Sequence, residues 1–106
     1  MALRELTQEE RDTARKKALA ARAERAEVKR GFGAGTLSFE QVLERAESSE
    51  AVARLKTIEL LEALPGIGRV TATKILEDHG VSFNRRLGGL GVKQRRGLAL
   101  HLAELS

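Results

Sequence analysis

Two glycines and two cations near the middle of the chain have the types and spacing that suit phosphate binding. Gly66 and Gly68 lie in the run LLEALPGIGRVTATKIL (residues 60–76), which also holds Arg69 and Lys74. Glycine lacks a side chain and adopts backbone angles that other residues avoid. The loop therefore exposes backbone N–H groups, some of them at the positive end of the next helix, where anions bind. The alternative is a tight corner between two helices, in which the glycines serve packing only.

The loop lies between two predicted helices. The first is capped by Thr57 and ends at Pro65, because the residue before a proline disfavours the helical conformation. The second spans residues 69–78 and is closed by Gly80 as a C-terminal cap. Their buried sides are expected to comprise Ile58, Leu60, Leu61 and Leu64 in the first helix and Val70, Ala72, Ile75 and Leu76 in the second.

Two capping boxes predict the helices that precede this pair. Thr7 with Glu10 opens a helix over residues 8–30, which is rich in strong helix formers. The run GFGAG at 31–35 is interpreted as a flexible joint, since no strand precedes it and its spacing is not that of a nucleotide-binding loop. Ser38 with Gln41 opens a helix over 39–47, and Ser49 caps a short helix over 50–55.

The C-terminal part is predicted to be helical as well. Ser82 begins a helical turn that extends through Leu87, and GGLG at 88–91 interrupts it. Residues 92–105 form the last helix, with Leu98, Leu102 and Leu105 on one face. No alternating strand pattern is evident, so we predict an all-α fold. Residues 1–35 form a long basic helix and joint, and residues 36–106 form a compact multi-helix domain.

The composition favours an acidic partner. The 106 residues carry a net charge of +4 with a pI of about 10, and nucleic acid is the first candidate partner for such a chain. Residues 1–30 hold nine Lys/Arg against six Asp/Glu, residues 31–64 hold three against six, and residues 65–106 hold seven against three. Two basic blocks thus flank an acidic middle, which allows two binding surfaces.

The residue types that support catalysis or metal binding are scarce. The chain has no cysteine, and His79 and His101 are expected to be isolated structural or surface residues. No Ser/His/Asp arrangement or carboxylate pair is evident, so we predict a protein without enzymatic activity, cofactor or metal. Residues 1–30 lack an apolar run long enough for a signal peptide or a membrane span, and the expected location is the cytoplasm.

Five cations form a predicted stripe along the first helix. At ~100° per residue they fall within roughly 40° of one line, with acidic residues near the opposite side. We call this set the basic stripe; its members are Arg11, Arg15, Arg22, Arg25 and Lys29. Such a stripe suits a helix that lies along a phosphate backbone. The alternative is a solvated surface helix with favourable i,i+4 pairs.

The central run resembles a known signature. LPGIG, then three residues, Ala and Ile-Leu, is similar to the helix-hairpin-helix motif, which binds the nucleic-acid backbone without reading sequence. GVS at 80–82, RRLGGLG at 85–91 and a final helix extend the likeness to the helix-two-turns-helix variant of a small-subunit ribosomal protein and of certain repair glycosylases. The whole chain, from its Ala/Arg-rich first helix onward, resembles the actinobacterial integration host factor family of nucleoid-associated proteins.

The resemblance implies a set of site residues. Gly66, Ile67, Gly68, Arg69 and Lys74 would contact phosphates of double-stranded DNA. Arg85 and Arg86, which we call the arginine pair, would lie at the DNA surface or in a groove. Relatives commonly carry a third arginine where this chain has Gly88, and that departure bears on the strength and geometry of the contact. The cations Lys93, Arg95 and Arg96 are either compensating phosphate contacts or the solvated face of the last helix.

The resemblance also implies a function and a context. The expected protein binds duplex DNA with weak sequence preference, bends or compacts it, and assists site-specific recombination, with phage integrase complexes as further partners. We expect a monomer in the nucleoid, without a membrane partner. The alternatives are an RNA- or ribosome-associated protein that uses the same hairpin, and a repair glycosylase, for which the chain has no catalytic domain.

Overall fold

The protein is all-helical in a computed structural model that describes residues 5–105. The predicted units 1–35 and 36–106 include residues 1–4 and 106, which lie outside the described residues, and the division of the chain at residue 35 stays a prediction. The elements in chain order are α1 (Gln8–Ala34), α2 (Phe39–Ser48), α3 (Glu50–Ala53), α4 (Thr57–Glu62), α5 (Arg69–Asp78), the 3-10 turn η1 (Leu87–Gly89) and α6 (Val92–Glu104).

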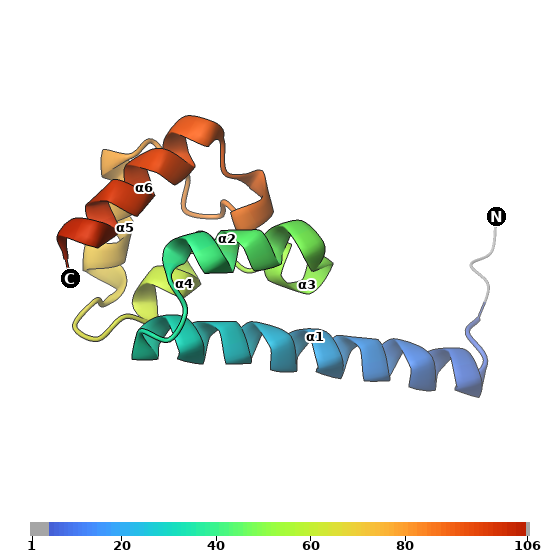
Figure 1. The fold of residues 1–106 in the computed structure, drawn as a ribbon. Helices are drawn as coiled ribbons and strands as arrows, with labels where there is room; N and C mark the ends of the chain where they lie inside the picture. Colours follow the sequence, from blue (N-terminus) through green and yellow to red (C-terminus); the bar gives the residue numbers. More distant parts are fainter. Residues whose placement is uncertain (1–4, 106) are drawn as a thin grey trace.

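Helix α1 projects well beyond the other helices, which gather around its C-terminal half (Figure 1). At ~1.5 Å per residue its 27 residues extend about 40 Å. The radius of gyration is 16.1 Å, against about 13 Å for a compact 100-residue domain. None of the described helices is both long and apolar enough to cross a membrane. In the first half of α1 nearly every residue is exposed.

The second half of α1 is docked on the body. Val28 and Phe32 are buried, and the Phe32 ring lies 6.3 Å from the Phe39 ring of α2. Polar contacts add to this packing: the hydroxyl of Ser49 donates to the Glu24 carboxylate over 2.8 Å. The aliphatic core extends from here through all the remaining helices. This docking fixes how the projecting half of α1 is presented.

The predicted break at residues 31–35 is wrong in its position. Helix α1 continues to Ala34, four residues beyond the predicted end, and only Gly35 stops it, at φ +80°. A β-carbon at Gly33 would lie 2.4 Å from the carbonyl oxygen of Ala63, so α1 and the end of α4 touch backbone to backbone. Gly33 therefore allows α1 and the end of α4 to approach closely, and the preceding residue, Phe32, anchors α1 in the core.

Several other expectations hold. The capping boxes of Thr7 with Glu10 and of Ser38 with Gln41 are both formed, with hydrogen bonds of 2.8–3.1 Å. Helix α5 has the predicted bounds. Gly80 has φ +66° directly after this helix, and the Val81 amide donates to the Leu76 carbonyl over 2.9 Å, which is the hydrogen bond of a Schellman ending.

Other local expectations are wrong. Thr57 does not cap α4 with its side chain: its hydroxyl is fully buried and unpaired among the described residues. Val70 was expected on the buried side of α5 but is 85% exposed. A turn does begin at Ser82, where the Arg85 amide donates to the Ser82 carbonyl over 3.0 Å. It does not extend as a helix through Leu87, and the 3-10 turn spans Leu87–Gly89 instead. Helix α2 extends one residue further, to Ser48, and α3 ends at Ala53 rather than 55.

Candidate nucleic-acid interface

The loop between α4 and α5 presents uncapped amides to solvent. Gly66 has φ +81°, which an L-residue rarely adopts, and Ile67 packs back against the core and so anchors the turn. Gly68 is the N-cap of α5, and no side chain among the described residues hydrogen-bonds as its cap. The first-turn amides of α5 therefore remain open to an anionic ligand.

The surroundings of Gly68 bear on the two interpretations of this loop. Gly68 has φ −92°, a conformation open to any residue, and a β-carbon built there would have nothing within 4 Å. Neither packing nor backbone conformation thus requires glycine at this position. The absence of a side chain instead leaves the amides of α5 open to close approach from outside. This favours the ligand-binding loop over the packing corner.

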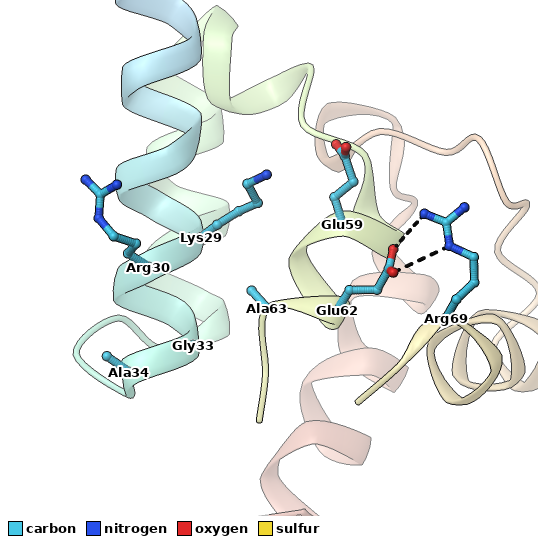
Figure 2. A pocket seen from close by; sticks show the side chains of 8 residues that line it. All are labelled: Lys29, Arg30, Gly33, Ala34, Glu59, Glu62, Ala63 and Arg69. Carbon is cyan, nitrogen blue, oxygen red and sulfur yellow. Dashed lines mark hydrogen bonds and ion pairs between the residues drawn. The ribbon is translucent and has the colours of Figure 1, made fainter. Parts of the chain in front are cut away.

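Arg69 at the first position of α5 is held by its neighbours. Its Nη2 donates to Glu62 Oε1 over 3.1 Å and its Nε donates to Glu62 Oε2 over 3.4 Å (Figure 2). Its guanidinium carbon lies 5.3 Å from the centroid of the Phe83 ring, a cation–π distance. Sequence reasoning singled out Arg69 but missed both partners; the only signals for them are a carboxylate seven residues before it and an aromatic two residues before the arginine pair. Lys74 is exposed on the same helix.

The arginine pair is carried by a loop that is bonded to the start of α4. The Thr57 amide donates to the Arg85 carbonyl over 3.0 Å, and the Leu87 amide donates to the Leu55 carbonyl over 2.9 Å. These bonds flank the isolated antiparallel bridge between Lys56 and Arg86. Both arginine side chains remain exposed, and Arg85 Nη1 also donates to the Gly89 carbonyl over 3.1 Å. The backbone is fixed while the charged ends stay accessible.

Gly88 lies against α3. A β-carbon there would be 3.0 Å from the β-carbon of Ala53 and 3.3 Å from its carbonyl oxygen. Any side chain would require η1 or α3 to move by a few tenths of an ångström. The absence of an arginine at this position thus coincides with a close contact between these two elements.

The cations of α6 differ in exposure. Lys93 and Arg96 are exposed, while Arg95 is half-buried. Between them, Gln94 joins the start of α6 to the end of α5, because its Nε2 donates to the Gly80 carbonyl over 2.9 Å and its Oε1 accepts from the Gly91 amide at the same distance. The assignment of these three cations to DNA binding stays a prediction.

The basic stripe divides into an outer and an inner part. Arg11, Arg15 and Arg22 are exposed, and Arg15 pairs with Asp12 over 2.6 Å. Arg25 turns to the body and donates to the Ala51 carbonyl over 3.3 Å. Arg25 is therefore engaged in a contact with the body. Arg11, Arg15 and Arg22 form the outer part of the stripe, which is accessible to a partner.

The inner end of the stripe reaches the hairpin loop. Lys29 lines an open hollow of about 760 Å³ between α1, α4 and the start of α5. Across the hollow lie Glu59, Glu62 and Arg69, so that Lys29 and Arg69 face one space from two helices (Figure 2). The hairpin and the stripe are therefore adjacent on one side of the molecule, with two carboxylates between them.

The two histidines are not isolated, contrary to the prediction. His79 Nε2 and His101 Nδ1 are 2.9 Å apart, and the rings meet edge to face with centroids 5.2 Å apart. The pair connects the end of α5 to α6, which is a structural role. Over residues 5–105 the structure contains no group of three or more His, Cys, Asp or Glu side chains placed to hold a metal ion.

Comparison with known proteins identifies the class of this fold and site. The family model described as the S13-like H2TH domain matches residues 32–102, which contain the hairpin, the arginine pair and most of α6. Integration host factor of Mycobacterium tuberculosis is 46% identical over 92% of this chain and 93% of its own length. The protein of that name from Streptomyces coelicolor is 44% identical over 89% and 88%. The chain belongs to the actinobacterial integration host factor family.

A solved structure shows the same fold. The structure of sIHF bound to an 8-bp palindromic DNA has a TM-score of 0.78 and 40% identity, covering 81% of this chain and 97% of that chain. The resemblance inferred from LPGIG and RRLGGLG is thereby confirmed at the level of family and fold.

Proposed function

We propose that this protein binds double-stranded DNA through its backbone and shapes it as a nucleoid-associated architectural protein. The observation that carries the proposal is the open N-terminus of α5, where Gly68 has empty space in place of a side chain. Arg69 adjoins these amides, and the exposed arginine pair adds charge from a fixed backbone. The relative solved with DNA supports the same partner.

The mechanism is phosphate capture without a catalytic step. Amides of the first turn of α5 donate to phosphate oxygens, while Arg69, Lys74 and the arginine pair neutralise charge. Contacts of this kind fix the position of a protein on DNA but do not read bases. Any sequence preference then comes from the deformability and groove width of the DNA.

The outer part of the basic stripe supplies a second surface. Arg11, Arg15 and Arg22 lie on a helix that projects from the body. Because the second half of α1 is docked, the hairpin and the stripe would act on one duplex as a fixed pair, or on two duplexes as a bridge. Bending or bridging by a monomer would account for a role in compaction and in assisting site-specific recombination with integrase complexes. This role places the protein in the cytoplasm, at the nucleoid.

RNA is the second candidate partner. The hairpin resembles that of a small-subunit ribosomal protein, and the matching family model is described as S13-like. Amides and arginines would hold RNA phosphates by the same chemistry, so the discrimination between the two partners has to be measured.

Fluorescence anisotropy with a labelled duplex of about 20 base pairs tests the proposal. The duplex is titrated at several salt concentrations, with a structured RNA as competitor. We expect binding whose log–log salt slope is several units, at about 0.9 per phosphate contact, and which RNA does not displace preferentially. Salt-independent binding, or preferential displacement by RNA, would overturn the proposal.

A duplex labelled at both ends tests the architectural part. Energy transfer between the ends rises on binding if the protein bends one duplex. Unchanged transfer together with pairing of two differently labelled duplexes indicates bridging. Unchanged transfer without pairing would leave only simple binding and contradict the architectural role.

A further inference from the structure

A carboxylate lies beside the hairpin loop, where a negative charge should oppose DNA. Glu62 is the last residue of α4, and its side chain is only 27% exposed. Its charge repels phosphates that approach the Gly68 amides, so it should weaken DNA binding unless its contacts support binding in another way. Its contacts are the two hydrogen bonds to the Arg69 guanidinium (Figure 2).

The two hydrogen bonds from Arg69 to Glu62, which we call the fork, orient the guanidinium and leave its other donors unused by Glu62. The fork uses Nε and Nη2, and a guanidinium has five N–H donors. Nη1 takes no part in the fork, and the side chain is 60% exposed. A bidentate carboxylate fixes the plane of the guanidinium more firmly than a single bond would. Arg69 is thus held with donors still free for a phosphate.

The Arg69 guanidinium also contacts an aromatic ring in the loop that carries the arginine pair. Phe83 lies in the loop two residues before Arg85, and its ring lies 5.3 Å from the guanidinium carbon of Arg69. The far end of that loop is bonded to the start of α4 through the backbone of residues 85 and 87. Arg69 therefore connects α4, α5 and the loop that carries the arginine pair.

We infer that Glu62 is a positioning residue for DNA binding, which acts through Arg69 and Phe83. The carboxylate holds Arg69 in the orientation that presents donors beside the hairpin amides, and the stacked Phe83 holds the near end of the arginine-pair loop. This inference rests on the proposed function. It predicts that removal of a negative charge weakens binding to a polyanion, the reverse of what net charge alone requires.

Glu59 provides a matched control. It lies one turn before Glu62 and lines the same hollow, and it forms no ion pair with any residue that the structure describes. Glu59→Gln and Glu62→Gln therefore remove the same charge from the same surface. Only the second variant breaks the fork with Arg69.

The experiment measures duplex binding by anisotropy for the two variants and the parent protein. Glu59→Gln should bind about twofold tighter, because a charge that repels phosphate is gone. Glu62→Gln should bind about two- to tenfold weaker than the parent, since a freed arginine must be immobilised again on binding. In the NMR spectrum, the Nε–Hε signal of Arg69 should exchange faster with solvent in Glu62→Gln and stay as in the parent in Glu59→Gln.

A thermal melt separates positioning from folding. A purely structural Glu62 would lower the melting temperature of Glu62→Gln and leave affinity unchanged well below that temperature. Unchanged affinity, or tightening equal to that of Glu59→Gln, would overturn the inference while the proposed function stands. Absence of duplex binding by the parent protein would overturn the proposed function itself, and the inference with it.

Discussion

Replacement of Gly68 by alanine separates the fold of the hairpin from its binding role. The added methyl group would meet no atom within 4 Å, and φ −92° suits alanine as well as glycine. Alanine is a poorer N-cap than glycine by about 0.5–1 kcal/mol, but it loses less backbone entropy on folding, by about 0.4–1 kcal/mol. The two effects nearly cancel, so the melting temperature should move by only a few degrees, at about 4–8 °C per kcal/mol.

The effect of this substitution on DNA binding should be much larger. The methyl group would stand between the α5 amides and a phosphate. Loss of a hydrogen bond to a charged group costs about 1.5–3 kcal/mol, which corresponds to about ten- to a hundredfold in Kd at 1.4 kcal/mol per tenfold. The salt slope should change little, because an amide carries no formal charge and releases no counterion.

Two further glycine variants calibrate this result. Gly91→Ala makes the same change at the N-cap of α6, where the nearest atom would be at 3.6 Å, and reports what the substitution costs the fold. Gly66→Ala imposes φ +81° on alanine and should destabilise the protein by about 1–2 kcal/mol. Anisotropy at fixed salt measures each Kd, and a thermal melt measures each stability. If Gly68→Ala binds duplex as tightly as the parent protein, the argument from the open N-terminus of α5 is refuted.

Three further predictions concern charge and burial. Alanine at both positions of the arginine pair should reduce the salt slope by about 1.8, at 0.9 per contact, and weaken all duplex sequences alike; an unchanged slope in anisotropy would remove the pair from the interface. Alanine at both Arg11 and Arg22 should weaken duplex binding more than alanine at both Lys16 and Lys17, although each pair of substitutions removes two positive charges from α1, because the two lysines lie off the basic stripe; equal losses of affinity would show that α1 acts only through its net charge. Thr57→Val should stabilise the protein by about 1 kcal/mol in a denaturant titration, because the buried hydroxyl has no partner among residues 5–105; destabilisation would show that the hydroxyl is satisfied in solution.

Local signals predicted the helices and the hairpin well. The capping boxes at Thr7 and Ser38 are short-range hydrogen bonds between residues three apart, so the sequence displays both partners together. The bounds of α5 follow from Gly68 before it and Gly80 after it. The LPGIG signature identified the family because the motif, the loop geometry and the helix start are contiguous.

Long-range contacts account for the failures. Gly33 lies within the helix, where the close approach of Ala63, thirty residues further along the chain, leaves no room for a side chain. Thr57 is fully buried, and its amide donates to the carbonyl of Arg85, twenty-eight residues further along the chain. The pairing of His79 with His101 spans two helices. No periodicity within a single segment contains this information.

The candidate site shows the same division between local and distant signals. Arg69 was predictable from its position after the hairpin, whereas its fork with Glu62 and its contact with Phe83 depend on how α4 and the arginine-pair loop fold back. The basic stripe was predicted from the helical wheel alone, but its division into outer and inner parts at Arg25 follows from the docking of α1.

A titration of the amide signals of the protein with a short duplex, followed by two-dimensional NMR, tests the central claim most directly. The account predicts that the largest shifts fall on the amides of residues 68–71 and on the arginine side chains of the hairpin and the arginine-pair loop. Shifts confined to α1 or to α6, with the amides of residues 68–71 unmoved at saturation, would contradict it.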